Sequence, residues 1–355
     1  MNAPIYLKLK KDLESSIAKG KFLPGETLPS ENELSEKYNI SRSSVRIVLS
    51  ELGEEGLIEK RPGKKTVVSN PRQNAHLPAK PATIGVDIAG HLFTSGYQYY
   101  QLLMNGIMSA SLDLNCRIQV VSDIKKIDAQ QIEGLIIAKY EDRLQKDILS
   151  IGEKIPVIVI NRVITQEYIG FVSTNHTFET FKAVEYMIQQ GHTRIGFIGN
   201  NKADGFQRQQ GYFSALKTYG IPCNERLVIS QNPSNALFDE IKKILKKTDI
   251  TAVFVASGEY FISFLDPVLR ELQIKIPEEL SVICFDDIEP DCFHYGPSLS
   301  CVRMPLFQMG CAAVESIASS GKTIMRKNFD AELVLRQSFR NLKRPAIKME
   351  EGMEQ

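Results

Sequence analysis

The sequence predicts an α/β protein with parallel sheets in its larger, carboxyl-terminal part and a small, mainly helical module in front of it. Residues 1–70 are rich in helix signals, whereas from residue 83 onward short apolar runs alternate with amphipathic helical stretches. Such alternation is typical of βαβ units, in which helices join parallel strands. Residues 71–82 contain three prolines and little periodicity, which indicates a linker.

Length, charge and composition narrow the class of protein. The 355 residues suggest two or three folding units, and a net charge of +1 means that any nucleic-acid contact needs a local basic surface. No Cys-x-x-Cys pair, metal-ligand histidine spacing, signal-peptide core or apolar run of membrane-spanning length is found. We therefore expect a cytoplasmic protein with no membrane contact, no metal and no cofactor.

The first two helices of the amino-terminal module are predicted from periodicity and capping. Apolar residues recur every three to four positions from Tyr6 to Ile17, which predicts a helix over residues 5–19. Ser30 and Glu33 have the Ser-x-x-Glu spacing of a capping box, so a second helix begins there.

A third helix follows after a short turn. Ser41 can cap it, and Arg42, Ser44 and Arg46 lie near its start, with both arginines off the buried stripe. That stripe consists of four apolar residues at helical spacing: Val45, Val48, Leu49 and Leu52. Two helices joined in this way are typical of a helix-turn-helix, whose second helix enters the DNA major groove. An arginine fork there matches O6 and N7 of guanine.

A basic hairpin is predicted after the third helix. Leu57-Ile58 and Val67-Val68 are apolar, and the turn between them holds Gly63, Lys64, Lys65 and Thr66. Such a wing can contact the DNA backbone or minor groove. For Arg42 alone a solvated basic helix face is an equal alternative, but the arginines and the wing lysines together favour DNA contact.

Three segments carry a family resemblance: LPSENEL at 28–34, SRSSVR at 41–46 and EGLIEKRPGKKTVV at 55–68. Residues 4–68 resemble the GntR type of winged helix. The resemblance implies DNA contacts for Ser41, Arg42 and Arg46, and a wing position for Gly63. Asn32 stands where many relatives carry a DNA-contacting arginine, and Lys65 replaces a second wing glycine. The operator preference is therefore expected to differ from theirs.

The remaining residues carry a second resemblance. GHTRIGFIG at 191–199, RQQGY at 208–212 and IPEELSVICFDD at 276–287 resemble the effector domain of LacI/GalR-type regulators, which has the type I periplasmic-binding-protein fold. A GntR-type head on this domain is the arrangement of arabinose-type repressors. The expected effector domain spans 83–343. Its expected lobes are 83–161 with 289–322, and 162–288 with 323–340.

The resemblance also implies effector-binding residues. The resemblance implies that Arg208 and Asp286 bind the effector. Both residues follow apolar runs and so belong at the carboxyl edge of a sheet, where ligands bind in open α/β folds. Phe93 and Tyr97 follow the first strand and can stack on a ligand, although each alone is more typical of packing. Ser257 and Gly258 replace the usual Asn-Asp pair of the pocket, which puts a familiar ligand in doubt.

These patterns predict a homodimeric repressor that binds double-stranded operator DNA and responds to a small polar effector, most simply a sugar. The alternative is a DNA-binding regulator with a degenerate pocket, controlled by a protein partner or by no small molecule. Two other classes fit less well. An exported solute-binding protein would not carry a helical head, and a nucleotide-using enzyme would need a phosphate loop or dinucleotide fingerprint, which are absent from the sequence. We therefore expect no catalytic residues.

Overall fold

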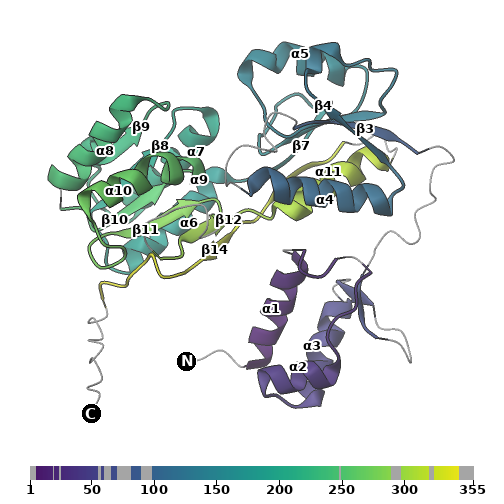
Figure 1. The fold of residues 1–355 in the computed structure, drawn as a ribbon, viewed down its shortest axis with the longest axis horizontal. Helices are drawn as coiled ribbons and strands as arrows, with labels where there is room; N and C mark the ends of the chain where they lie inside the picture. Colours follow the sequence, from purple (N-terminus) through teal and green to yellow (C-terminus); the bar gives the residue numbers. More distant parts are fainter. Residues whose placement is uncertain are drawn as a thin grey trace. The chain divides into compact units, whose positions relative to one another are not determined.

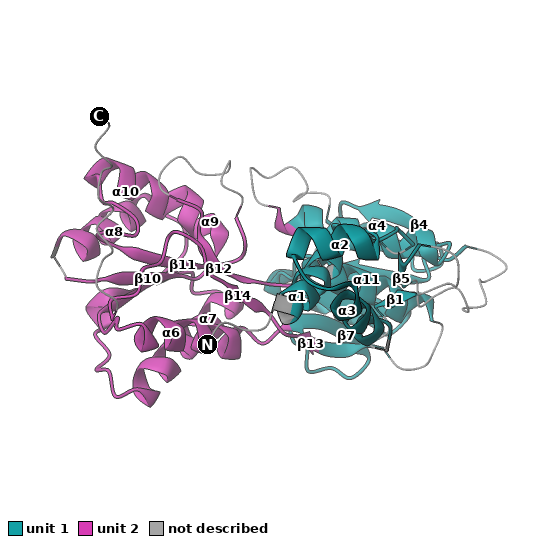
Figure 2. Cartoon of the chain, turned by 90° about the horizontal axis from the view of Figure 1, so that it is seen from below, with its two compact units in different colours: residues 1–92, 100–173, 305–327 teal, residues 93–99, 174–304, 328–355 magenta. Residues whose placement is uncertain are grey.

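The computed structural model describes residues 5–18, 20–23, 25–54, 57–59, 65–69, 81–88, 98–247, 249–288, 297–319 and 324–343. The chain forms two compact units, coloured separately in Figure 2. Unit 1 comprises residues 1–92, 100–173 and 305–327, and unit 2 comprises residues 93–99, 174–304 and 328–355. None of the helices in the described ranges is long and apolar enough to cross a membrane.

The amino-terminal head has the predicted elements. Its three helices and two short antiparallel strands are α1 (Ile5–Ala18), α2 (Glu31–Tyr38), α3 (Arg42–Glu54), β1 (Ile58–Glu59) and β2 (Val67–Val68). The Ser30 hydroxyl accepts a hydrogen bond from the Glu33 backbone N–H, and the Glu33 carboxylate accepts one from the Ser30 backbone N–H, so the capping box is confirmed. The predicted stripe of α3 is at most 1% exposed and packs on Leu9 and Leu13 of α1.

The rest of unit 1 is built on a six-stranded sheet in the order β13-β7-β6-β5-β3-β4 (Figure 1). The strand pairs from β4 through β7 are all parallel. The strands are β3 (Thr83–Asp87), β4 (Arg117–Val121), β5 (Gly134–Ile137), β6 (Val157–Ile160), β7 (Ile169–Thr174) and β13 (Arg326–Phe329). No α-helix lies between β4 and β5, and a single 3-10 turn, Ile124–Lys126, is the one helical element of that connection.

Helices α4 (Tyr99–Asp113) and α11 (Leu306–Ala318) lie side by side against this sheet, and α5 (Gln145–Gly152) lies on its other side (Figure 1). Two glycines allow α4 and α11 to approach closely. A Cβ atom on Gly106 would lie 2.0 Å from the Phe307 carbonyl oxygen, and one on Gly310 would lie 2.3 Å from that of Leu103. A larger residue at either position would therefore push the helices apart.

Unit 2 contains the second six-stranded sheet, in the order β14-β12-β11-β10-β8-β9. It is parallel except for β14, which pairs antiparallel with β12. Its strands are β8 (Ile195–Gly199), β9 (Val228–Ser230), β10 (Ala252–Val255), β11 (Ser281–Phe285), β12 (Ser300–Arg303) and β14 (Glu332–Val334). Its α-helices are α6 (His176–Gln189), α7 (Ala203–Thr218), α8 (Asn235–Lys247), α9 (Gly258–Tyr260) and α10 (Asp266–Leu272), with a π-helical turn at Phe261–Leu265.

The points where the chain passes between the units differ from the expected lobe boundaries. Residues 162–173 are expected in the second lobe, but β7 continues the parallel ladder of β6 and so belongs to unit 1. Residues 289–304 are expected in the first lobe, but β12 pairs with β11 in unit 2. The ladder pairing of β7 and β12 decides their membership, and apolar runs alone do not reveal which neighbour a strand pairs with.

Candidate DNA interface and effector site

The start of α3 is held by a serine cluster. The Ser41 hydroxyl accepts a hydrogen bond from the backbone N–H of Ser44 at 3.1 Å, and its oxygen lies 2.7 and 2.9 Å from the hydroxyls of Ser43 and Ser44. The cap therefore fixes where the helix begins. The remaining first-turn amides and the positive end of the helix dipole suit a phosphate at this position.

The two arginines predicted to contact DNA are exposed on α3, as is Asn32 on α2. Arg46 is also held by an ion pair that sequence reasoning missed, in which its Nε lies 2.7 Å from Oε2 of Glu31. The capping box fixes Glu31 in the first turn of α2, so this carboxylate links the two helices of the helix-turn-helix. The residues are fifteen positions apart, and no local pattern could have revealed the pair.

The wing is anchored to the loop before α2. The Leu28 amide donates to the Thr66 carbonyl at 2.9 Å, and Val68 exchanges hydrogen bonds with the backbone of residues 25 and 26. Lys65 is exposed and Thr66 is half-buried. The predicted contacts Gly63 and Lys64 lie outside the described residues.

Arg208 lies at the centre of a buried polar cluster in unit 2. Its side chain extends from α7, and the residue is only 2% exposed. Its Nε donates to Nδ1 of His176 at 3.2 Å, a terminal nitrogen donates to the Ala256 carbonyl, and its guanidinium lies 3.8 Å from the ring centre of Phe285. His176 begins α6, so the cluster brings together side chains from α6, α7 and β11. It lies at the carboxyl ends of β10 and β11.

Two aspartates flank this cluster. Burial alone would raise the pKa of Asp204, but the charges of Arg208 and His176 and nearby backbone N–H groups hold that pKa below its ordinary value. Asp286 is 5% exposed, and its Oδ2 accepts a hydrogen bond from the Gly258 amide at 3.3 Å. Its φ of 83° is in the region that favours glycine, and such strain concentrates at functional sites. Both predicted residues, Arg208 and Asp286, therefore contribute to one polar region.

The other predicted effector residues are placed differently. Ser257 caps the short helix α9 by accepting a hydrogen bond from the Tyr260 amide at 3.4 Å, so its hydroxyl has a structural partner. Phe93 and Tyr97 lie outside the described residues. His176, which the sequence reasoning did not select, is the closest side-chain partner of Arg208.

Unit 1 also presents polar groups at the carboxyl edge of its sheet. Asn161 follows β6 with a φ of 57°, and its side-chain oxygen is buried with no hydrogen-bond partner among the described residues. Burial, and then the charges of Glu141 and Asp123, raise the pKa of Asp87 at the end of β3. Each of these residues directly follows or ends a predicted strand, a signal that could have identified them.

Comparisons with known proteins show what the two parts of the chain are similar to. Residues 5–68 match the gntR family of bacterial regulatory proteins, and residues 184–339 match a periplasmic binding protein-like domain. The chain thus combines a gntR-like head with a periplasmic binding protein-like domain. The arabinose metabolism transcriptional repressor of Geobacillus stearothermophilus is 25% identical to it, over 96% of this chain and 98% of that protein.

Another relative and one solved structure match a smaller share of the chain. The regulator GalR of Salmonella typhimurium strain SL1344 is 31% identical over 50% of this chain and 53% of its own length. A LacI-family regulator from Enterococcus faecium, solved with bound ribose, is 23% identical, covers 74% of this chain and all of its own, and has a TM-score of 0.59. That structure supports the fold of the effector domain.

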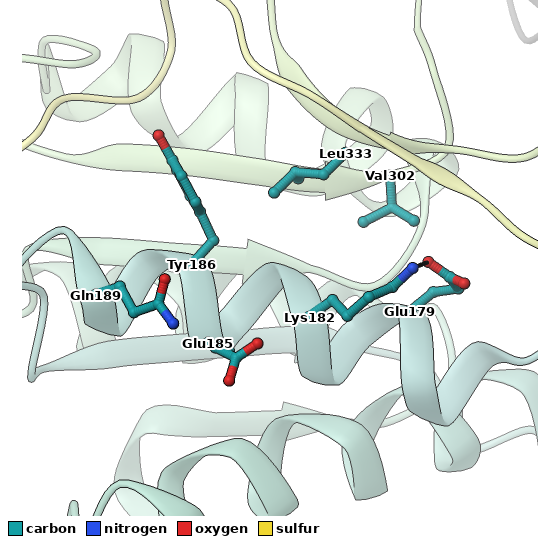
Figure 3. Close-up of a pocket in the computed structure, with 7 residues that line it drawn as sticks. All are labelled: Glu179, Lys182, Glu185, Tyr186, Gln189, Val302 and Leu333. Carbon is teal, nitrogen blue, oxygen red and sulfur yellow. Dashed lines mark ion pairs between the residues drawn. The ribbon is translucent and has the colours of Figure 1, made fainter. Parts of the chain in front are cut away.

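A separate surface pocket lies in unit 2, over α6 (Figure 3). Its volume is about 260 Å³, and its lining includes none of the predicted effector residues. Glu179 pairs with Lys182 at 2.6 Å, and Glu185 accepts a hydrogen bond from the Tyr219 hydroxyl at 2.7 Å. The charged groups of this pocket thus pair with neighbours of the same unit. Among the described residues, no three His, Cys, Asp or Glu side chains gather as metal ligands would.

Proposed function

We propose that this regulator is a homodimeric, non-enzymatic, cytoplasmic repressor that binds operator DNA through α3 and its wing and is released by a sugar. The observation that carries the proposal is the presence in one chain of a capped helix with exposed arginines and a buried arginine–histidine–carboxylate cluster. The proposed DNA contacts are Asn32, Ser41, Arg42, Ser44, Arg46, Gly63, Lys64, Lys65 and Thr66.

The chemistry of the Arg208 cluster suits a polyhydroxylated ligand. Sugars present vicinal hydroxyls that both donate and accept hydrogen bonds, and an arginine beside carboxylates offers both kinds of partner. Phe285 adds an aromatic ring beneath the guanidinium. The arabinose repressor named above supports a sugar as the effector class. In this proposal Arg208 and Asp286 contact the ligand and His176 positions Arg208, while Phe93, Tyr97 and Ser257 are secondary candidates.

An exposed apolar face on unit 1 supports the homodimer. Met108 and Leu112 are four residues apart on α4, so they share one side of the helix, and they are 41% and 78% exposed. Side chains of this size are normally covered when they gather on a helix face. A second copy would cover the face symmetrically. Two heads on one dimer then reach half-sites about 34 Å apart.

The test begins with the full-length chain and a random-sequence duplex pool, from which bound sequences are enriched. Pentoses, hexoses, uronic acids and sugar phosphates are then titrated into the complex, and DNA binding is followed by fluorescence anisotropy. A coupling of about 1–3 kcal/mol would weaken operator binding about 5- to 150-fold. Failure to enrich any sequence would overturn the DNA-binding function.

A second candidate function is favoured by one observation. Ser257 already caps α9, and Arg208 is almost fully buried with partners inside unit 2, so the cluster has a self-contained hydrogen-bond arrangement. That arrangement fits a regulator whose pocket takes no small molecule and whose control comes from a protein partner. Calorimetry of the same compounds against the DNA-free protein distinguishes the two. Binding heat with any sugar favours the first function, and its absence throughout favours the second.

A further inference from the structure

The recognition helix carries one large apolar side chain that the head does not use for folding. Ile47 is 55% exposed, more than any other large apolar side chain in the described part of the head. The core cluster of the head includes Val45, Val48, Leu49 and Leu52 of the same helix but not Ile47. Leaving such a side chain in water forgoes about 1.5–3 kcal/mol of burial free energy, so its position calls for a partner.

Helical geometry places Ile47 on the outward face of α3. With about 3.6 residues per turn, Ser43 and Ser50 share its side of the helix, opposite the buried stripe. Both serines are exposed, and Arg46 borders the same face. Ile47 is therefore a bulky apolar group between two small polar residues, Ser43 and Ser50. The proposed function directs this face of α3 into the major groove.

We propose that Ile47 contacts the 5-methyl group of a thymine and so helps to set which operator this regulator binds. In the major groove only thymine presents a methyl group, and apolar side chains recognise it by direct contact. The neighbouring arginines Arg42 and Arg46 favour a polyanionic partner over an apolar protein surface. The inference rests on the proposed DNA-binding function and adds one base contact to it.

The experiment removes the methyl group from the DNA and the side chain from the protein in separate steps. Operators enriched by the full-length chain are synthesised with each thymine in turn replaced by deoxyuridine, and affinities are measured by fluorescence anisotropy. At one thymine per half-site, deoxyuridine should weaken wild-type binding about fourfold, the effect expected for one buried methyl-sized group. Ile47→Ala should bind the two DNAs equally.

Leu23→Ala is the matched control, because Leu23 is a 42% exposed apolar residue of the same head outside α3. It should retain the wild-type preference for thymine. Thermal unfolding should show that Ile47→Ala folds as the wild type does. The inference is overturned if the wild type binds its operator tightly and no deoxyuridine replacement matters, or if Ile47→Ala keeps the preference. Neither result touches the proposed function, which fails only if no operator is enriched.

Discussion

Arg46 and Arg42 differ in how the free protein holds them, although both are exposed on α3. Glu31 pairs with Arg46, whereas the structure records no such ion pair for Arg42 within its described part. An exposed pair of this kind contributes about 0–1 kcal/mol to stability, so its importance lies in orientation. Glu31 therefore holds one guanidinium in place on α3 before DNA arrives.

Replacing either arginine should reduce specificity. Arg42→Ala and Arg46→Ala should each lose about 1–3 kcal/mol of binding to the operator, because a bidentate guanine contact discriminates by that amount. Binding to unrelated duplex should fall much less. Anisotropy titrations with both DNAs at one salt concentration measure the two losses. Equal losses on both DNAs would reduce the arginines to phosphate contacts.

Glu31→Gln should lower the ratio of specific to non-specific affinity. Without the carboxylate, Arg46 loses its fixed orientation, while removal of a negative charge strengthens attraction to any phosphate backbone. Glu36→Gln removes the same charge from another exposed position of α2 and serves as the control. If both variants change the ratio equally, charge alone explains the effect and Glu31 has no positioning role.

His192 should make folding sensitive to mildly acidic pH. It is fully buried and its ring bonds to Thr251 and the Arg340 carbonyl, and burial lowers its pKa below the ordinary value. The folded state therefore stays neutral where the unfolded state binds a proton. Stability is fully present above the unfolded pKa, about 6.5, and declines as pH falls below it.

Chemical unfolding of the wild type and His192→Gln between pH 7.5 and 5.5 measures this effect. The wild type should lose up to about 1.4 kcal/mol per pH unit from this site, and the variant should show a shallower slope. The comparison uses slopes, so a general destabilisation of the variant does not affect it. Identical slopes would show that His192 does not titrate differently in the two states.

At the scale of single elements, the caps are what the sequence specifies most directly. Ser30→Ala removes the cap of α2 and should lower the stability of the head by about 0.5–2 kcal/mol. Ser50→Ala, at an exposed position inside α3, should leave stability nearly unchanged. Thermal unfolding of the two full-length variants, followed by circular dichroism, measures the difference. An equal effect of both would mean that the cap contributes little.

Elements with strong local signals were predicted, and those defined by pairing were not. The capping box, the stripe of α3 and the apolar strands β3, β5, β6, β8, β10 and β11 all follow from the order of residues. Strand β13, Arg-Lys-Asn-Phe, is mostly exposed and has no apolar pattern, and β9 is only three residues long. Such edge strands become visible only when their neighbours are known.

The candidate site shows the same division. Arg208 and Asp286 were predicted, but by resemblance together with their position after apolar runs. Their partner His176 lies 32 residues before Arg208, and the stacking of that arginine on Phe285 depends on how α7 packs over β11. These contacts form only in the folded unit, so residue order could not reveal them.

At the scale of the whole molecule, the proposed dimer predicts how a substitution on α4 changes the oligomeric state. Leu112→Lys places a charge on the apolar face of α4 and should convert a dimer into a monomer. Its operator affinity should fall, because only one head then binds at a time. Leu335→Lys, at another exposed leucine in unit 2, is the control. Sedimentation velocity measures the oligomeric state, and a wild-type monomer at micromolar concentration would contradict the dimer.

The interleaved strand order has a consequence for how the chain emerges from a ribosome. The head has a hydrophobic core of its own, but the first sheet is complete only with β13 and the second only with β14, both beyond residue 325. The ribosome must therefore translate past residue 325 before either sheet is complete. A transcript cut short upstream of β13 would yield a fragment with an intact head and two unfinished sheets. Under the proposed function, such a fragment would occupy operators without responding to the sugar.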